Sequence, residues 1–149
     1  MEARIGILTI SDRAYAGVYE DESGPAVLQT LENIISSKWA PVKSLVPDEI
    51  DSIEEALIRL VDKEACCLVI TTGGTGPSAR DVTPEATENV CDRMMPGYGE
   101  LMRNISLEYV PTAVLSRQTA GLRGGSLILN LPGSPKAIDQ TLIPLFESI

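Results

Sequence analysis

Short apolar runs alternate along this chain with stretches in which apolar residues recur at helical spacing. The runs at 5–10 and 67–72 are dominated by apolar residues and lack regular polar alternation, which is typical of strands buried on both faces. Between them, the apolar residues of 27–35 recur at i, i+4, i+7 and i+8, so they share one face of a helix. This alternation predicts an α/β fold, a three-layer sandwich with a mostly parallel sheet.

Turn and capping residues complete the expected order of elements. Asp48 or Asp51 is available as the N-cap of a helix over 53–61, and Thr83 as the N-cap of the next helix. Gly124 and Gly125 predict a two-residue hairpin turn, which adds an antiparallel element to the sheet. The expected strands are 5–10, 42–46, 67–72, 119–123 and 126–131, and the expected helices are 27–35, 53–61, one from Pro84, about 99–109, and one carrying residues 138–146.

The chain contains no histidine, which restricts the chemistry open to it. Nucleophiles activated by histidine and histidine metal sites are excluded, so any reaction must rely on carboxylates, backbone amides, lysine, arginine and a bound cation. The net charge of −9 repels nucleic acid and anionic membrane surfaces, and we expect neither as a partner. A small anionic ligand is still compatible with this charge, because local backbone N–H groups can hold a phosphate.

The 149 residues correspond in length to one domain, and we treat 1–149 as a single unit. The sequence has no charged leader followed by an apolar run and no apolar stretch long enough to span a membrane. Its three cysteines lack zinc-site spacing, and their odd number argues against a disulfide framework. We therefore expect a cytoplasmic protein.

Several polar or glycine-rich segments follow the carboxyl ends of the predicted strands. These segments are Ser11-Asp12, Asp48, the glycine-rich stretch after Thr72, and Pro132–Pro135. In open α/β sheets, ligands bind at this edge, near a switch in strand order. The sequence therefore places its candidate functional residues at one edge of the sheet.

The glycine-rich stretch is the strongest single motif. Gly73, Gly74 and Gly76 allow the backbone to approach a ligand and to present successive N–H groups to phosphate oxygens. The stretch lacks the Gly-Lys-Ser/Thr of a P-loop, and it does not match the dinucleotide-binding fingerprint. The alternative is that these glycines only form a sharp turn between a strand and a helix.

Each candidate acidic residue also has two interpretations. Asp81 follows the glycines and is placed to hold Mg²⁺ against phosphates, or it accepts a hydrogen bond from a nearby amide ahead of the helix. Asp48 is a ligand or a helix N-cap, and Asp12 is a ligand or a turn-forming residue. Gly133 and Ser134 form an anion site before the last helix or a simple strand-to-helix turn.

Taken together, the order and spacing of these segments resemble the molybdopterin adenylyltransferase family, the MogA-type proteins, and the N-terminal domain of gephyrin. The likeness covers nearly the whole chain and is densest over Thr71–Glu85. The other segments that carry it are Gly6–Arg13, Val46–Glu49, Met95–Gly97, Leu115–Arg117, Gly121–Gly124 and Leu127–Gly133.

This resemblance implies an enzyme that transfers AMP from ATP to the terminal phosphate of molybdopterin and releases pyrophosphate. It also implies a homotrimer, Mg²⁺ as cofactor with ATP as co-substrate, and a separate protein that inserts molybdenum. The alternative is a non-catalytic molybdopterin-binding or scaffolding trimer of the same fold. Asp48 and Asp81 correspond to the family's acidic residues, and we predict both as catalytic and metal-binding. The predicted substrate-binding residues are Ser11, Asp12, Thr71, Gly73, Gly74, Thr75, Gly76, Arg80, Asn130, Pro132, Gly133 and Ser134.

Overall fold

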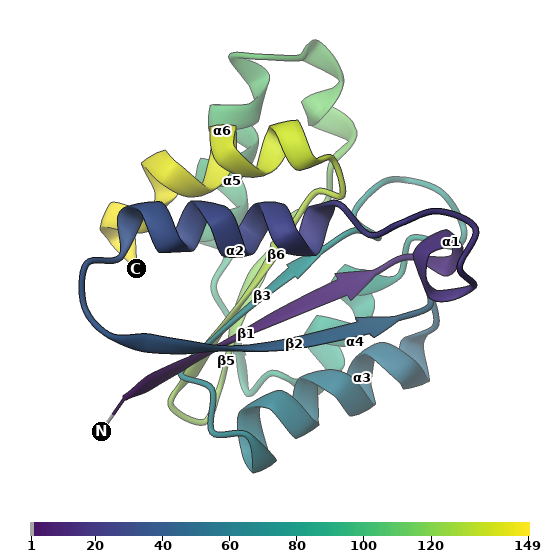
Figure 1. Ribbon diagram of the computed structural model, residues 1–149. Coiled ribbons are helices and arrows are strands. Elements are labelled where there is room, and N and C mark those ends of the chain that lie inside the picture. Colours follow the sequence, from purple (N-terminus) through teal and green to yellow (C-terminus); the bar gives the residue numbers. More distant parts are fainter. Residues whose placement is uncertain (1) are drawn as a thin grey trace.

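A computed structural model describes residues 2–149 and has three layers, with helices on both faces of a central sheet (Figure 1). The six strands lie in the order β2-β1-β3-β6-β5-β4. Their bounds are β1 Ala3–Ile10, β2 Trp39–Val46, β3 Leu68–Thr72, β4 Arg93–Met94, β5 Ala120–Arg123 and β6 Ser126–Leu131. Strands β2, β1, β3 and β6 are parallel, whereas β4 and β5 are antiparallel to their neighbours. The predicted fold class is confirmed, including the hairpin at Gly124.

Helices cover both faces of the sheet. Successive side chains of each strand point to opposite faces, so apolar residues on both faces need to be covered. The helices are α1 Asp12–Tyr15, α2 Ser23–Ile34, α3 Ile50–Ile58, α4 Thr83–Val90, α5 Pro96–Leu107 and α6 Pro135–Leu145, with a π-helical turn at Arg59–Lys63 and 3₁₀ turns at Pro111–Leu115 and Phe146–Ser148. Helices α2, α5 and α6 cover a core that includes Ile7, Ile70 and Leu129. Helices α3 and α4 cover the other core, which includes Val69 and Ile128.

Two helix starts differ from the sequence predictions. Helix α3 has Glu49 as its N-cap residue and no side-chain cap, so neither Asp48 nor Asp51 has the predicted capping role. Asp48 instead accepts a hydrogen bond from the Asp12 amide. The N-cap residue of α4 is Val82 rather than Thr83, because the Thr83 hydroxyl donates to the carbonyl of Gly73. In both cases a tertiary partner outcompetes the local cap.

The strand order changes direction at β1, which lies between β2 and β3. The arrowheads of these three strands point toward the same edge, the one beside α1 (Figure 1). Such a switch point opens a crevice at the carboxyl ends of the strands. Gly73 follows β3 at this edge, and a Cβ atom added to Gly73 would overlap the carbonyl oxygen of Ile10, the last residue of β1.

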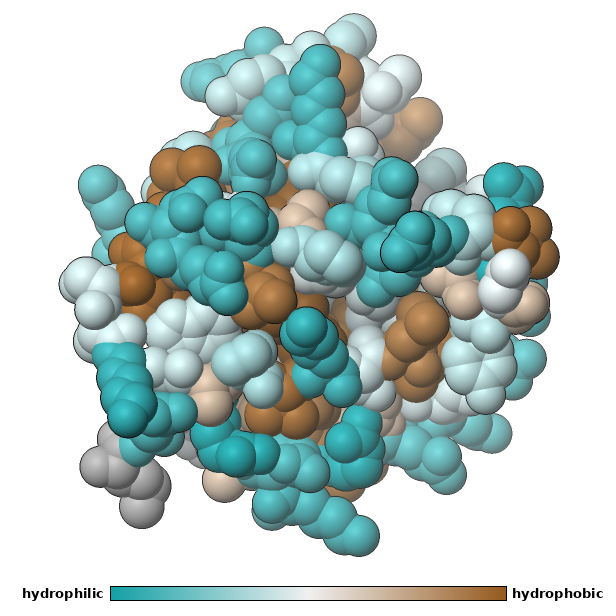
Figure 2. All heavy atoms as spheres, viewed as in Figure 1, coloured by the Kyte–Doolittle hydropathy of each residue, from teal (hydrophilic) through white to brown (hydrophobic). Residues whose placement is uncertain are grey.

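The surface on the side shown in Figure 2 is predominantly hydrophilic, and its hydrophobic residues form small separate patches. Within residues 2–149, every helix is too short or too polar to cross a membrane.

Candidate functional site

The glycine loop, residues 73–76, has a backbone that only glycine adopts readily at its first two positions. Gly73 and Gly74 have φ angles of 103° and 70°. An added Cβ would overlap the Ile10 carbonyl oxygen at Gly73 and the Thr83 hydroxyl at Gly74. Both the backbone conformation and the close neighbours therefore require glycine here.

Three successive N–H groups of the glycine loop, those of Gly74, Thr75 and Gly76, have no acceptor within the described part of the chain. Unpaired backbone N–H groups in a row bind anions, because each contributes a partial positive charge and a directed donor. The unpaired N–H groups therefore favour the prediction that the loop binds phosphate oxygens over the alternative that it only forms a sharp turn.

Two residues fix the glycine loop from outside. Thr83 donates its backbone N–H to Gly74 O at 3.1 Å and its hydroxyl to Gly73 O at 2.9 Å. Arg117 donates its backbone N–H to Thr75 O at 2.7 Å and its Nε–H to Gly76 O at 3.0 Å. The sequence did not identify either residue as functional, although Arg117 lies within one of the segments that resemble the adenylyltransferases.

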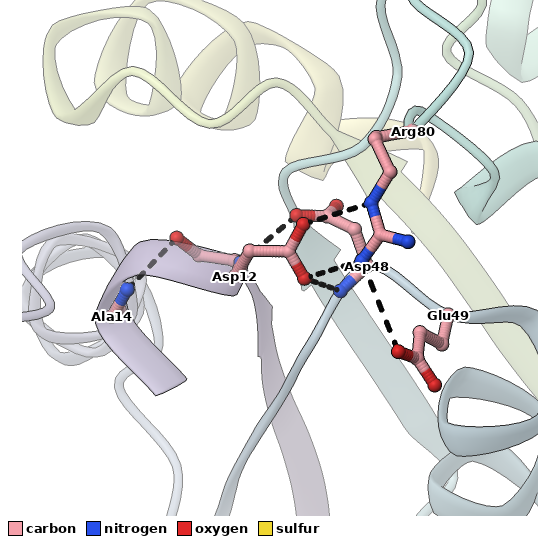
Figure 3. A network of polar contacts seen from close by, with 6 residues as sticks. Asp12, Ala14, Asp48, Glu49 and Arg80 are labelled. Carbon is pink, nitrogen blue, oxygen red and sulfur yellow. Dashed lines mark hydrogen bonds and ion pairs between the residues drawn. The ribbon is translucent and has the colours of Figure 1, made fainter. Parts of the chain in front are cut away.

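Asp12 and Asp48, at the ends of β1 and β2, form a reciprocal pair (Figure 3). Each carboxylate accepts a hydrogen bond from the other residue's backbone N–H at 2.9 Å. Arg80 binds both carboxylate oxygens of Asp12, at 3.0 and 2.8 Å, and its Nη2 lies 3.9 Å from Glu49. The predicted site residues Asp12, Asp48 and Arg80 therefore meet, although Arg80 contacts a carboxylate here and its predicted binding of substrate stays a prediction.

The two members of this pair have opposite pKa shifts. The hydrogen bonds from Arg80 hold the pKa of Asp12 below its ordinary value. Burial raises the pKa of Asp48, and the nearby charges of Asp12 and Asp81 add to this rise despite the hydrogen bond from the Asp12 amide. A bound cation would stabilise the ionised form of Asp48, which its present surroundings disfavour.

Asp48 and Asp81 lie beside the glycine loop. Asp48 Oδ1 is 3.2 Å from the position of a Cβ on Gly74, and Asp81 Oδ2 is 2.8 Å from the corresponding position on Gly76. Asp81 Oδ2 accepts the Ser78 amide, the local hydrogen bond considered as the alternative role for Asp81. The second oxygen of each carboxylate, Oδ1, accepts no hydrogen bond. This is true of both Asp48 and Asp81 within residues 2–149.

No group of three or more acidic or cysteine side chains in residues 2–149 is arranged to enclose a metal ion. Mg²⁺ usually takes only one or two carboxylates together with water and phosphate oxygens. Asp48 and Asp81 are compatible with that simpler arrangement, in which they would hold the ion and a ligand's phosphates would complete its coordination.

Two predicted substrate-binding residues lie beneath the surface. Thr71 and Asn130 are both 0% exposed, and Asn130 Nδ2 donates at 3.0 Å to the hydroxyl oxygens of Thr71 and Thr87. This polar group packs between the sheet and α4. Both side chains are therefore buried in this structure, although Asn130 Oδ1 has no hydrogen-bond partner in the described residues, and the predicted contact of Thr71 and Asn130 with substrate stays a prediction.

Ser11 has a local role at the same edge. Its side chain accepts the Ala14 amide at the start of α1 and lies 3.0 Å from the Tyr19 hydroxyl. Gly133 brings the turn before α6 against the glycine loop, since a Cβ on Gly133 would lie 3.4 Å from the Cα of Gly73. The two turns that the sequence placed at one edge are thus in contact.

A cavity of about 450 Å³ opens beside the turn before α6, lined by Pro132 and Ser134 and by residues of α5 and the 3₁₀ turn that follows it. Ser116 and Gln118 also line this cavity, and Gln118 is only 1% exposed. The Oγ of Ser116 and the Oε1 of Gln118 are buried without a partner in the described residues. Buried polar atoms are rarely left unpaired, so these two oxygen atoms lack a partner that a ligand or a water molecule would supply.

The chain resembles known proteins over almost its full length. A domain family described as "Probable molybdopterin binding domain" matches residues 6–147. The Helicobacter pylori molybdopterin adenylyltransferase is 54% identical over 145 residues, which are 97% of this chain and 82% of the relative. The Escherichia coli (strain K12) molybdopterin adenylyltransferase is 55% identical over 139 residues, which are 93% of this chain and 71% of the relative.

Solved structures agree with the sequence relatives. The crystal structure of the molybdopterin biosynthesis enzyme MoaB from Thermus thermophilus superposes with a TM-score of 0.87 and 42% identity, over 99% of this chain and 91% of that one. Because the family match spans most of the chain and the relatives align over nearly all of it, this chain belongs to the molybdopterin-binding domain family of molybdenum-cofactor biosynthesis.

Proposed function

We propose that this protein is a molybdopterin adenylyltransferase, which transfers AMP from ATP to the terminal phosphate of molybdopterin and releases pyrophosphate. One observation carries the proposal: a loop with three unpaired N–H groups lies between two carboxylates and contacts the turn that lines a ligand-sized cavity. The chain is also 54% and 55% identical to two molybdopterin adenylyltransferases.

The cavity suits the pterin part of the substrate. Its volume of about 450 Å³ is in the range typical of small-molecule sites. Ser116 and Gln118 supply unpaired oxygen atoms for the N–H groups of a pterin ring. Ser134 and Lys136 line the cavity at the start of α6, where a helix N-terminus and a lysine favour a phosphate. Molybdopterin bound in this way directs its terminal phosphate toward the glycine loop.

The glycine loop suits the phosphates of ATP. The N–H groups of Gly74, Thr75 and Gly76 supply donors that are already oriented before the ligand arrives, so little reorganisation is needed as negative charge develops. Asp48 and Asp81 would hold Mg²⁺, whose charge neutralises the triphosphate and allows a second anion to approach. The two free Oδ1 atoms and the raised pKa of Asp48 fit a bound cation.

The nucleophile needs no protein base. A phosphate monoester is largely ionised at neutral pH, because its second pKa is near 6. The absence of histidine is therefore compatible with the reaction. What the protein contributes is position and charge, the two effects that dominate phosphoryl-group chemistry.

Three further properties belong to the same proposal. The protein would act as a homotrimer and would pass its product to a separate molybdenum-inserting protein. Exposed apolar side chains on α5 and the turn after it give such an assembly a surface; they are Leu101, Leu107, Val110, Val114 and Leu115. A cytoplasmic location fits the free cysteines Cys66, Cys67 and Cys91.

Pyrophosphate release from purified protein tests the proposal. With molybdopterin and Mg-ATP together, we expect pyrophosphate in an amount equal to the molybdopterin consumed, and none when either substrate is left out. Tight molybdopterin binding without any pyrophosphate would reject the adenylyltransferase in favour of a binding-only protein.

A further inference from the structure

The segment 116–118 joins the cavity to the glycine loop. Ser116, at its start, has an extended backbone with a ψ angle of 131°. Ser116 and Gln118 line the cavity, whereas the Arg117 side chain reaches the glycine loop. One short segment thus forms part of the pterin site and also holds the phosphate site.

Arg117 uses its donors within the protein. Its backbone N–H binds Thr75 O, its Nε–H binds Gly76 O at 3.0 Å, and its Nη2 binds Asp81 O at 2.6 Å. Its Nη1 forms an ion pair with Glu85, and this contact lowers the pKa of the Glu85 carboxyl. The guanidinium is therefore fixed in a single orientation by partners on both sides of the loop.

These contacts determine where the loop's N–H groups point. In a trans peptide unit the carbonyl and the following N–H point in opposite directions. Thr83 binds the carbonyls of Gly73 and Gly74, which orients the N–H groups of Gly74 and Thr75 away from Thr83. The backbone N–H of Arg117 binds the carbonyl of Thr75, which orients the N–H of Gly76 away from Arg117. The Arg117 guanidinium instead holds the carbonyl of Gly76, which precedes Pro77, and the carbonyl of Asp81.

We propose that Arg117 is a positioning residue for adenylyl transfer: its guanidinium holds the carbonyls of Gly76 and Asp81, and so fixes the end of the glycine loop and the predicted metal ligand Asp81 beside the wall of the pterin cavity. The inference rests on the proposed function, since it assigns the loop to the phosphates of ATP. It adds a residue that touches neither substrate but sets the distance between the two binding sites.

The geometry also indicates why arginine is needed. Three partners lie in different directions in the guanidinium plane, namely Gly76 O, Asp81 O and Glu85. A lysine ammonium is a compact charge on a flexible stem and does not reproduce this planar fork. Arg117→Lys is therefore expected to keep the charge and lose the positioning.

The test compares Arg117→Ala and Arg117→Lys with Arg123→Ala. Arg123 offers a matched control, because it also holds a carboxylate, Asp62, and a carbonyl, that of Val90, but at the opposite end of the sheet. For both Arg117 variants we expect kcat for pyrophosphate release to fall about 100-fold, the scale of misplacing a reacting group by about 1 Å. The Kd for molybdopterin, followed by pterin fluorescence, should stay within about threefold, because Ser116 and Gln118 remain. Arg123→Ala should keep kcat within about twofold, since its contacts are remote from the site.

Chemical rescue separates positioning from folding. Guanidinium ions at tens of millimolar should restore part of the rate of Arg117→Ala and leave wild type and Arg123→Ala unchanged. If Arg117→Ala does not fold, Arg117→Lys carries the comparison. A folded Arg117 variant with near-wild-type kcat, or an equal fall in Arg123→Ala, would overturn the proposal.

A binding measurement distinguishes this inference from the proposed function. If the wild-type protein releases no pyrophosphate, the adenylyltransferase proposal fails, but calorimetry with Mg-pyrophosphate still probes the loop. Arg117→Ala should then weaken pyrophosphate binding by about tenfold or more, the scale of one charge-assisted hydrogen bond. Unchanged pyrophosphate affinity would reject the role of Arg117 on its own.

Discussion

Replacing Thr83 with valine tests how the glycine loop is held. Thr83 is fully buried, and its hydroxyl donates at 2.9 Å to the carbonyl of Gly73. Valine keeps the shape of the side chain and removes only this donor. The Gly73 carbonyl then lacks its partner, and a buried unsatisfied polar group costs about 1–3 kcal/mol.

The change in melting temperature follows from this free energy. At about 4 °C per kcal/mol for a chain of this length, Thr83→Val should lower the melting temperature by roughly 4–12 °C. Urea unfolding monitored by the fluorescence of Trp39, the single tryptophan, measures the free energy of unfolding directly. Pyrophosphate release should fall as well, because the Gly73 carbonyl sets the direction of the Gly74 N–H.

Thr119→Val is the matched control, since the Thr119 side chain has no hydrogen bond within residues 2–149. Its free energy of unfolding should change by less than about 0.5 kcal/mol. The reasoning is refuted if Thr83→Val costs no more than Thr119→Val, because the hydroxyl would then have no role in holding the loop.

Three other changes probe the site. Asp81→Asn should slow pyrophosphate release by about 100-fold or more, the scale of losing one key electrostatic group, and should leave the Kd for molybdopterin unchanged; a wild-type rate across a range of Mg²⁺ concentrations would exclude Asp81 as a metal ligand. Gly74→Val should weaken binding of Mg-ATP in calorimetry and also lower the melting temperature, since an added Cβ overlaps the Thr83 hydroxyl; unchanged affinity in a folded variant would leave the loop a structural role only. Asp48 has a raised pKa in the folded protein, so its contribution to stability is fully present below the unfolded-state value and is lost as pH rises through the folded-state value. Asp48→Asn should therefore gain stability relative to wild type as pH rises through that acidic range. Urea unfolding at a series of pH values should show that the free energy of unfolding of Asp48→Asn, minus that of wild type, grows with pH and then levels off. If this difference stays flat or falls, the pKa of Asp48 is not raised.

The fold was predictable where the pattern is local. The buried run that became β3 has a period and length that leave few alternatives, and Gly124-Gly125 specified the hairpin. The predicted N-caps of α3 and α4 were wrong because Asp48 and Thr83 make hydrogen bonds outside the helices that they were expected to cap. Asp48 pairs with Asp12, and the spacing of residues within one segment does not predict that contact.

The site was predictable only in part, for a related reason. Glycines and acids after strand ends identified the residues around the loop, and the structure brings Asp12, Asp48 and Arg80 together. The cavity depends on how α5 and the turn after it pack near α6, which the sequence pattern does not specify. Arg117 is a single basic residue distant in sequence from the loop it holds, so only the contacts in the folded chain identify it.

The fate of the α-phosphate tests the central claim most directly. The protein is incubated with molybdopterin, Mg²⁺ and ATP labelled at the α-phosphorus in one experiment and at the γ-phosphorus in another, and the pterin product is isolated after a single turnover. The account predicts that the α-label appears in the pterin product, that the γ-label appears in pyrophosphate, and that the product gains the mass of one adenylyl group. An α-label that remains entirely in ATP, or a γ-label that appears on the pterin, would contradict adenylyl transfer by this protein.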